Sequence, residues 1–332
     1  MNAMASAATL MASKSKAVPS LRLQCPLCGT VLGALSEQEP SPAFDCKSCH
    51  FELRAEDGIW RALAPDRVAH FARFMKEYES IREAEGRGSS DADYYLALPY
   101  RDLSGHNQTQ WAIRGQTYRF LEQTIFPTLE SGGLKNLGVL DLGAGNCWMS
   151  YRLALRGYSP VAVDLLASQA DGLGAAIHYR GQIPELFPRF QAELDRLPFA
   201  SGQFDVAIFN ASFHYSENYG DTLGEAIRCL RPGGTVIIAD TAWYSRNVSG
   251  ERMVAERREQ FTKRYGFPSD AIASLEYLTD QRLNDLERQF GITWRVYAPF
   301  YGVQWALRPV LAKLKGKREP SRFRIYAAEV SK

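Results

Sequence analysis

The chain has 332 residues, 45% of them hydrophobic and 23% charged, so it is long enough to bury one large core or two modest ones. Its 39 lysines and arginines nearly balance its 37 acids, and the formal net charge is +2. That balance argues against a protein held on nucleic acid by bulk charge. No apolar run approaches the ~20 residues that cross a bilayer, so we expect no membrane partner.

Residues 1–20 are rich in serine and alanine and contain no acid. Lys14 and Lys16 follow the apolar stretch instead of preceding it, which disfavours a secretory signal. A disordered tail, or a start at Met4 or Met11, is favoured over a transit peptide. We therefore predict a tail outside the fold and a cytoplasmic protein.

Residues 21–65 hold two CxxC pairs separated by 17 residues, and each pair sits on a tight turn between short apolar stretches. The four cysteines are Cys25, Cys28, Cys46 and Cys49. Four thiolates suit a closed tetrahedral zinc site that has no open position for catalysis. The pattern predicts a zinc ribbon with structural Zn²⁺, and it disfavours a redox pair or unrelated thiols. His50 in place of Cys49 is the alternative fourth ligand.

Residues 66–130 are predicted to form a helical N-terminal extension that closes as a lid. Phe71, Phe74 and Tyr78 recur at helical spacing, and we interpret them mainly as core. The segment "YYLALPYRD" interrupts the helical period with a proline. Its Tyr94 and Tyr95 are candidates for the lid, with ordinary core packing an equal alternative, and Arg101 is a further candidate.

From residue 131 onward the pattern is strand, turn and helix, repeated. Strands are expected at the segments "GVLDL", "PVAVD", "RFQAE", "FDVAIFN" and "TVIIAD", then at "TWRVYAPF" and "SRFRIYAAEV". A helical insertion is expected over about 245–292. This alternation predicts an α/β protein with a mainly parallel sheet and helices on both faces, with its ligand at the carboxyl ends of the central strands.

The turn after the first of these strands, Asp141–Gly145, has the glycines that let backbone approach a ligand, and a helix follows it. Asp164 ends the next strand, where a carboxylate can accept both hydroxyls of a ribose. These features alone fit a nicotinamide enzyme and a methyltransferase equally well.

The later segments "ELDRLPFASGQFDVAIFNASFHY" and "EAIRCLRPGG" resemble successive motifs of the class I, type 11-like, S-adenosylmethionine-dependent methyltransferases. The resemblance covers about 137–242 and implies a Rossmann-like seven-stranded sheet that binds S-adenosyl-L-methionine. In that family an acid before "LPF" bonds the adenine amino group, which corresponds to Glu193, with Asp195 as the nearby alternative. The positions implied for the donor are Asp141, Gly143, Ala144, Gly145, Asp164, Leu165, Glu193, Leu194 and Asn210.

Two further candidates complete the predicted donor site. Arg114, in a predicted helix, is assigned to the carboxylate of the donor, although an exposed salt bridge is the commoner fate of such an arginine. Tyr95 is assigned to the lid over the donor.

His214 and Tyr215 follow the fourth strand of the domain and are expected to face the cleft as catalytic residues. His214 has the titration range of a general base. A role as a wall of the donor pocket is the alternative, and it is slightly favoured.

The substrate is inferred less directly. An aromatic lid, a helical insertion and near-neutral charge favour a small-molecule methyl acceptor in an enclosed pocket. The alternative is methylation of ribosomal or other RNA, with the ribbon and the basic run at 313–319 holding the phosphates. A degenerate fold that only binds a partner is disfavoured by the intact set of donor residues. The role of the ribbon and the oligomeric state are left open.

Overall fold

The computed structural model describes residues 20–36, 43–131, 133 and 136–331. The tail predicted over 1–20 therefore lies outside the described residues, apart from Ser20. In the described part of the chain, no helix is both long enough and apolar enough to cross a membrane.

The N-terminal region combines a small all-β module with a run of helices. Its strands are β1 (Leu21–Gln24), β2 (Val31–Leu35), β3 (Ala43–Asp45), β4 (Glu52–Glu56) and β5 (Ile59–Arg61). The helices that follow are α1 (Pro65–Ala84), α2 (Ala92–Ala97), α3 (Gln108–Phe120), a π-helical turn (Leu121–Ile125) and α4 (Phe126–Ser131).

The rest of the chain alternates strands and helices as predicted. The first part holds β6 (Gly138–Leu142), α5 (Trp148–Leu155), β7 (Ser159–Asp164), a 3-10 helix (Leu173–Tyr179), β8 (Arg189–Gln191), β9 (Phe204–Asn210) and a 3-10 helix (Phe213–Tyr215). The second part holds α6 (Tyr219–Cys229), β10 (Leu230–Ala239), α7 (Asn247–Tyr265), α8 (Asp280–Phe290), β11 (Arg295–Tyr297), α9 (Val303–Leu314) and β12 (Ile325–Glu329).

The main sheet has the order β11-β12-β10-β9-β6-β7-β8-β5-β4-β3. Strands β6 to β10 are parallel, and β12 is inserted antiparallel between β10 and β11. The stretch from β11 to β8 is the predicted seven-stranded class I methyltransferase sheet. The chain leaves β6 toward β7 on one side and later returns to β9 on the other, so the topological switch point lies at β6.

The sheet does not stop at β8, because β5 pairs with β8 in parallel and carries β4 and β3 behind it. The β-hairpin β1–β2 also contacts the body: the backbone N–H of Gln24 donates to the Pro198 carbonyl at 3.1 Å, and that of Ala200 donates to the Arg22 carbonyl at 3.0 Å. Strands β3 to β5 of the N-terminal module therefore belong to the main sheet, while β1 and β2 form a separate two-stranded sheet that contacts the body.

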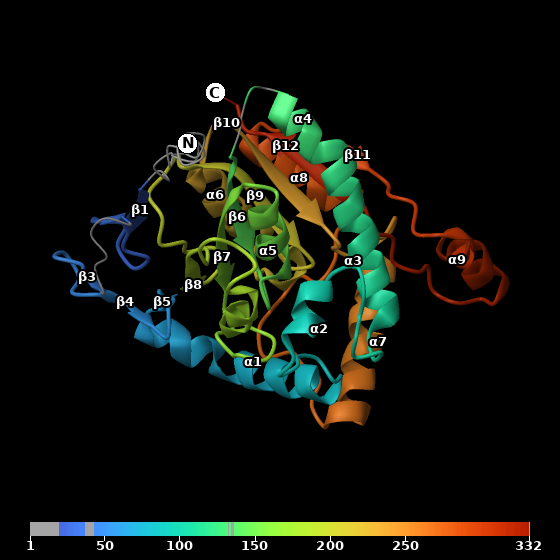
Figure 1. The fold of residues 1–332 in the computed structure, drawn as a ribbon. Helices are drawn as coiled ribbons and strands as arrows, with labels where there is room; N and C mark the ends of the chain where they lie inside the picture. The colour runs from blue at the N-terminus through green and yellow to red at the C-terminus, as the bar shows by residue number, and fades with distance from the viewer. Residues whose placement is uncertain (1–19, 37–42, 132, 134–135, 332) are drawn as a thin grey trace, which may run out of the picture.

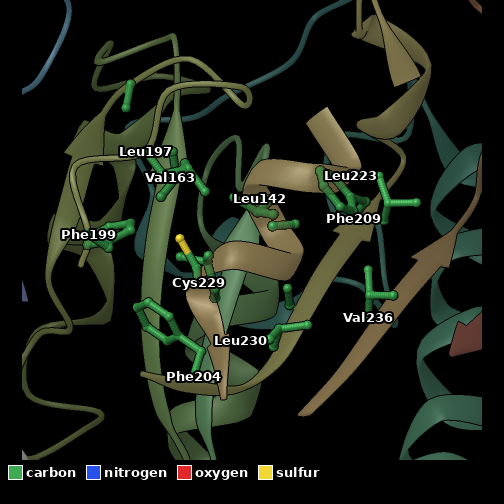
Figure 2. Packing of buried hydrophobic residues seen from close by; sticks show 14 of the residues in the cluster. Leu142, Val163, Leu197, Phe199, Phe204, Phe209, Leu223, Cys229, Leu230 and Val236 are labelled. Carbon is green, nitrogen blue, oxygen red and sulfur yellow. The ribbon is translucent and has the colours of Figure 1, made fainter. Parts of the chain in front are cut away.

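Helix α6 illustrates how the core is closed against the sheet. Its first turn is capped by Asn218, whose side chain accepts hydrogen bonds from the backbone N–H groups of Gly220 and Asp221. Leu223 and Ala226 are fully buried, and Figure 2 shows Leu223 beside Phe209 of β9. The helix thereby fixes β9 and β10, whose carboxyl ends carry site residues.

Helix α9 differs from the other long helices. None of its residues is buried, and it projects from the body of the molecule (Figure 1). The sequence pattern predicted strands on both sides of it but no helix between them. In the same region the predicted insertion is present as α7 and α8 (Figure 1).

Candidate functional site

A cavity opens at the carboxyl ends of β6, β7 and β9, and we name it the glycine-turn cavity. Predicted residues that line it are Gly143, Ala144, Gly145, Asp164, Leu165, Leu194, Asn210, Arg114 and Tyr215. Further lining residues are Phe74, Tyr78, Arg82, Trp111, Asn146, Trp148, Leu166, Ala211 and Ser212. Most of the predicted donor residues are thus brought together, although they come from segments distant in the sequence.

The turn after β6 requires glycine for two reasons. Gly143 and Gly145 have φ angles of +76° and +53°, the left-handed region that favours glycine. A Cβ atom on Gly143 would also lie 2.2 Å from the Cβ of Ser212. Since the backbone N–H groups of Gly143 and Ala144 both donate to the Val163 carbonyl, at 2.8 and 2.9 Å, the turn is fixed against β7.

Asp164 is held in place by the same turn. Its Oδ2 accepts a hydrogen bond from the backbone N–H of Gly145 at 2.8 Å, and its Oδ1 accepts one from Leu166 at 2.8 Å. Burial raises the pKa of this carboxyl, while the two backbone N–H groups oppose the shift. The carboxylate is therefore oriented before any ligand arrives, and each oxygen keeps a lone pair for a further donor.

Asp141 does not line the cavity, although the sequence assigned it to the donor. Only 1% of it is exposed, and it accepts a hydrogen bond from the Ser150 hydroxyl at 2.6 Å. Burial raises its pKa to about 7 against the opposing hydrogen bond from Ser150, and the neighbouring Asp164 carboxylate adds to the rise. Asp141 thus fixes α5 against β6 and supports the glycine turn from behind.

Glu193 is likewise buried and does not line the cavity, whereas the adjacent Leu194 does. Its carboxylate binds the guanidinium of Arg67, with Nε at 2.8 Å and Nη2 at 2.6 Å. Arg67 comes from α1, so the acid assigned to the adenine amino group instead holds a helix in place.

Three residues of α1 line the cavity at four-residue spacing: Phe74, Tyr78 and Arg82. The ring centroids of Phe74 and Tyr78 lie 5.9 and 5.7 Å from that of Tyr215. Arg82 forms an ion pair with Asp171. From the sequence we interpreted the two aromatic residues mainly as core. Arg82 lies on the same face of the helix, and this charged residue was the sign that the face does not simply pack into a core.

Tyr95 is not at the cavity, in contrast to its assignment to the lid. It is fully buried, its hydroxyl lies 2.6 Å from the Ala170 carbonyl oxygen, and its ring stacks on His178 at a centroid distance of 4.3 Å. Tyr94 is also buried and is not among the lining residues. Within the predicted lid segment 66–130, the residues that line the cavity therefore come from α1 and α3, and not from the two tyrosines.

Arg114 from α3 does reach the cavity. Its guanidinium lies 4.9 Å from the Trp111 ring centroid, and it makes no hydrogen bond or ion pair to the other described residues. Burial lowers its pKa to about 10, and the nearby cations Arg87 and Arg82 act in the same direction. The Asp240 carboxylate opposes this shift from nearby, but no described carboxylate is bonded to the guanidinium, which is still charged and is suited to bind an anionic group.

The two predicted catalytic residues line different cavities. Tyr215 lines the glycine-turn cavity, and burial raises the pKa of its hydroxyl well above the ordinary value, so it stays protonated. His214 does not line this cavity but a neighbouring one. Burial, together with Arg114 and Arg257, lowers the pKa of His214 to about 3, which removes the titration range on which its assignment as a base depended.

The four ribbon cysteines gather as predicted, with their sulfur atoms all within 4.8 Å of one another. The Sγ atoms of Cys25 and Cys49 are 3.4 Å apart, as are those of Cys28 and Cys46. Zinc–sulfur bonds of ~2.3 Å in a tetrahedron place sulfurs about 3.8 Å apart, so the set fits a closed metal site. His50 is outside this set and occupies a left-handed turn position, with φ of +60°.

Comparison with known proteins shows which family part of this chain is similar to. Residues 140–238 match a family of methyltransferase domains. An arsenite methyltransferase of Aquipseudomonas alcaligenes is 28% identical over 47% of this chain and 44% of its own length. A malonyl-acyl-carrier-protein O-methyltransferase of Enterobacter lignolyticus is 32% identical over 31% of this chain and 39% of its own length. The matched stretches thus span about two fifths of these relatives.

Among solved structures, magnesium protoporphyrin IX methyltransferase of Synechocystis PCC 6803, with bound S-adenosylhomocysteine, is 14% identical. It covers 80% of this chain and 100% of its own, with a TM-score of 0.47. The matched family segment contains the strands β7 to β9 and most of β6 and β10, and with them the glycine turn, Asp164 and Asn210. Residues 140–238 therefore match a methyltransferase domain, and a cluster of four cysteines precedes them.

Proposed function

We propose that this protein is an S-adenosylmethionine-dependent methyltransferase that acts on a small-molecule acceptor. The observation that carries the proposal is the oriented carboxylate of Asp164 beside the glycine turn, at the switch point of a class I sheet. A ribose diol donates two hydrogen bonds, and this carboxylate presents two acceptors at a fixed angle. The matched methyltransferase segment contains both features.

The other lining residues are suited to contact different parts of the donor. Leu165 and Leu194 offer apolar contact for the adenine ring, and Gly143, Ala144 and Gly145 allow close approach to backbone. Asn210 lies in the cavity, and its buried Oδ1 has no partner among the described residues. The guanidinium of Arg114 is in the same cavity and forms no ion pair with a described residue. These two suit the amino and carboxylate groups of the methionine part.

When bound, S-adenosylmethionine supplies a methyl group on a sulfonium, and the residues of this chain align and desolvate the reactants. Phe74 and Tyr78 of α1 and Tyr215 form an aromatic wall over the cavity. Such rings exclude water, and their faces are favourable neighbours for a cation.

A small acceptor is favoured over RNA by the positions of the basic run and the ribbon. The ribbon strands β3 to β5 extend one edge of the sheet. Residues 313–319 lie instead against α7 and the segment after β10, where Arg318 pairs with Glu256 and Ser245 bonds Glu319; Figure 1 shows the ribbon and α9 on opposite sides of the molecule. These two regions are therefore too far apart to form one phosphate-binding surface on this chain.

We also propose that the four cysteines hold structural Zn²⁺, and that the ribbon supports the lid. Strand β5 ends at Arg61 and α1 begins at Pro65, so the module determines where the lid helix starts. None of the four cysteines forms a disulfide, which fits a reducing cytoplasm.

The test is calorimetric titration of the purified chain with S-adenosylhomocysteine, with NAD as the control nucleotide. We expect a dissociation constant on the order of micromolar for the first and no measurable heat for the second. A parallel measurement of binding to total RNA at two salt concentrations separates the alternative, because phosphate contacts weaken steeply with salt. Absence of S-adenosylhomocysteine binding would remove the methyltransferase proposal.

A further inference from the structure

A second cavity adjoins the first and shares Arg114 and Ala211 with it; we name it the Asp240 cavity. Its other lining residues come from widely separated segments: Gln110, Ile113, His214, Asp240, Ala242, Met253, Arg257, Glu276, Trp305 and Phe323. The rings of Trp305 and Phe323 are stacked, with centroids 5.4 Å apart and planes at 20°. The cavity thus offers an aromatic wall next to the proposed donor site.

Asp240 follows β10 directly and is held in an unusual conformation. Its φ is +51°, although it is not glycine, and only 6% of it is exposed. Such strain persists only where surrounding structure imposes it, and it concentrates at functional sites. The backbone N–H of Ala211 donates to the Ala239 carbonyl at 3.0 Å, so Asp240 lies beside a residue that borders both cavities.

A chain of hydroxyl groups orients the Asp240 carboxylate. Its Oδ1 accepts a hydrogen bond from the Thr117 hydroxyl at 2.6 Å, and the Tyr301 hydroxyl lies 2.9 Å from the same Thr117 oxygen. Since Thr117 donates its one proton to Asp240, Tyr301 must donate to Thr117. Oδ2 of Asp240 is buried and has no partner among the described residues. One oxygen is therefore fixed and the other is free to accept a proton.

The charged and titratable groups that line the cavity with Asp240 come from α3, α7, the segment before α8 and the turn after β9. The charge of Arg114 on α3 acts on Asp240, and Arg114 makes no ion pair with a described residue, while Arg257 on α7 is paired with Glu276. His214 lies on the turn after β9, and its Nδ1 has no partner among the described residues. Burial raises the pKa of Asp240 to about 6, against the opposing effects of Thr117 and Arg114. His214 stays neutral over the same pH range, so one of its ring nitrogens can accept a hydrogen bond, but the ring does not take up a second proton.

We propose that the Asp240 cavity binds the methyl acceptor, that the acceptor is a small aromatic molecule with an ionisable hydroxyl, and that Asp240 is the general base. This inference rests on the proposed function. As the acceptor oxygen forms its bond to the methyl carbon, the carbon–sulfur bond breaks and its electron pair stays on sulfur as a thioether. The hydroxyl proton passes to Oδ2 of Asp240 and later to solvent.

The chemical class follows from the cavity. Trp305 and Phe323 match a planar ring, and Ile113 and Met253 add apolar walls. A carboxylate that titrates near neutral pH is matched to a hydroxyl acidified by a ring. An ammonium group would keep its proton beside this carboxylate and offer no lone pair, and Arg114 would oppose its charge.

The test uses the full chain with 2-naphthol as the probe and 1-naphthylmethylamine as the matched amine. Calorimetry with S-adenosylhomocysteine is run first on the wild type, Asp240→Asn, Thr117→Val and the surface control Asp221→Asn. Transfer of the methyl group from S-adenosylmethionine to 2-naphthol is then followed by chromatography of the methyl ether from pH 5 to 8.

We expect all four proteins to bind S-adenosylhomocysteine within about threefold of one another. Asp240→Asn is expected to lower ether formation by ~100-fold or more, in the range typical of a lost general base, and Asp221→Asn is expected to leave it unchanged. The wild-type rate should rise with pH through about 6, as Asp240 loses its proton. Thr117→Val removes a hydrogen bond that favours the ionised carboxylate, so it should move that rise to higher pH.

Three results would overturn the inference while leaving the proposed function intact: S-adenosylhomocysteine binds but 2-naphthol is not methylated, the amine is methylated in its place, or Asp240→Asn retains the wild-type rate. Failure of the wild type to bind S-adenosylhomocysteine is the distinct result that removes the proposed function, and the inference with it.

Discussion

The glycine-turn cavity and the Asp240 cavity adjoin one another, yet they are built in different ways. The first is formed largely by three turns that directly follow β6, β7 and β9, and backbone N–H groups set its geometry. The second combines residues that follow β9 and β10 with side chains of α3, α7 and α9 and of the segments before α8 and β12. A local turn geometry can be predicted from a short sequence motif, whereas a convergence of distant side chains cannot.

Their two carboxylates show the same contrast. Both oxygens of Asp164 accept backbone N–H groups, while Asp240 has one oxygen bound to a hydroxyl and the other without a partner. Burial raises both pKa values. Asp164 is thus suited to hold hydroxyl groups without giving up its charge, and Asp240 is suited to take a proton.

The largest effect is expected for Asp164→Ala. Each hydrogen bond to a charged group contributes roughly 1.5–3 kcal/mol, so the loss of two should weaken S-adenosylhomocysteine binding by at least about 100-fold. Calorimetry measures this directly. Asp221→Asn, on the surface of α6, is the control for the loss of one negative charge. Unaltered affinity in Asp164→Ala would exclude it from the site.

A smaller loss of S-adenosylhomocysteine affinity at the glycine-turn cavity is expected for Cys46→Ser. Zinc content should fall from about one per chain to none, because three thiolates and a serine hold the metal poorly. The ribbon leads directly into α1, which lines the glycine-turn cavity but contributes nothing described to the Asp240 cavity. We therefore expect S-adenosylhomocysteine affinity to fall about tenfold.

Metal analysis and calorimetry on the same sample check this prediction, and Cys229→Ala, a buried cysteine of α6, is the control that should keep its zinc. Unchanged zinc in Cys46→Ser would contradict the ligand assignment. Loss of zinc with unchanged S-adenosylhomocysteine affinity would instead show that the ribbon is not needed to position the lid helix α1.

Tyr78→Ala should have a moderate effect, because it removes one ring from the aromatic wall of α1. An aromatic pair contributes about 0.5–1.5 kcal/mol beyond burial, which corresponds to a loss of roughly two- to twelvefold in affinity. Tyr95→Phe is the matched control, since that hydroxyl bonds backbone away from the cavity. If Tyr95→Phe weakened binding more than Tyr78→Ala did, the lid would belong to the predicted "YYLALPYRD" segment after all.

The sequence was sufficient for the seven strands from β11 to β8 and for the turns that end the central ones. The positions of Gly143, Gly145 and Asp164 follow from strand ends that a local apolar pattern marks, and the structure brings them to one cavity. The stripe of Phe74 and Tyr78 was visible too, but periodicity shows only that a helix has an apolar face. Whether that face meets a core or roofs a cavity depends on which segment lies opposite.

Other features depend on contacts between distant segments. The pairing of β5 with β8 joins residues about 130 positions apart, and the hydrogen bond from Thr117 to Asp240 spans 123 positions. No window of sequence contains both partners. The same limit affected Glu193, whose carboxylate is bound by Arg67, 126 positions earlier.

The smallest effect is expected for His214→Gln, and it sharpens the contrast between the two cavities. Because burial lowers the pKa of His214 to about 3, the imidazole is neutral throughout the range in which Asp240 titrates. Glutamine keeps a hydrogen-bonding group of similar size, so turnover of 2-naphthol should change by no more than about threefold, and the rise near pH 6 should persist. If that rise disappeared in His214→Gln but survived in Asp240→Asn, the proton would pass to the histidine, and the burial of His214 would have to be relieved when the acceptor binds.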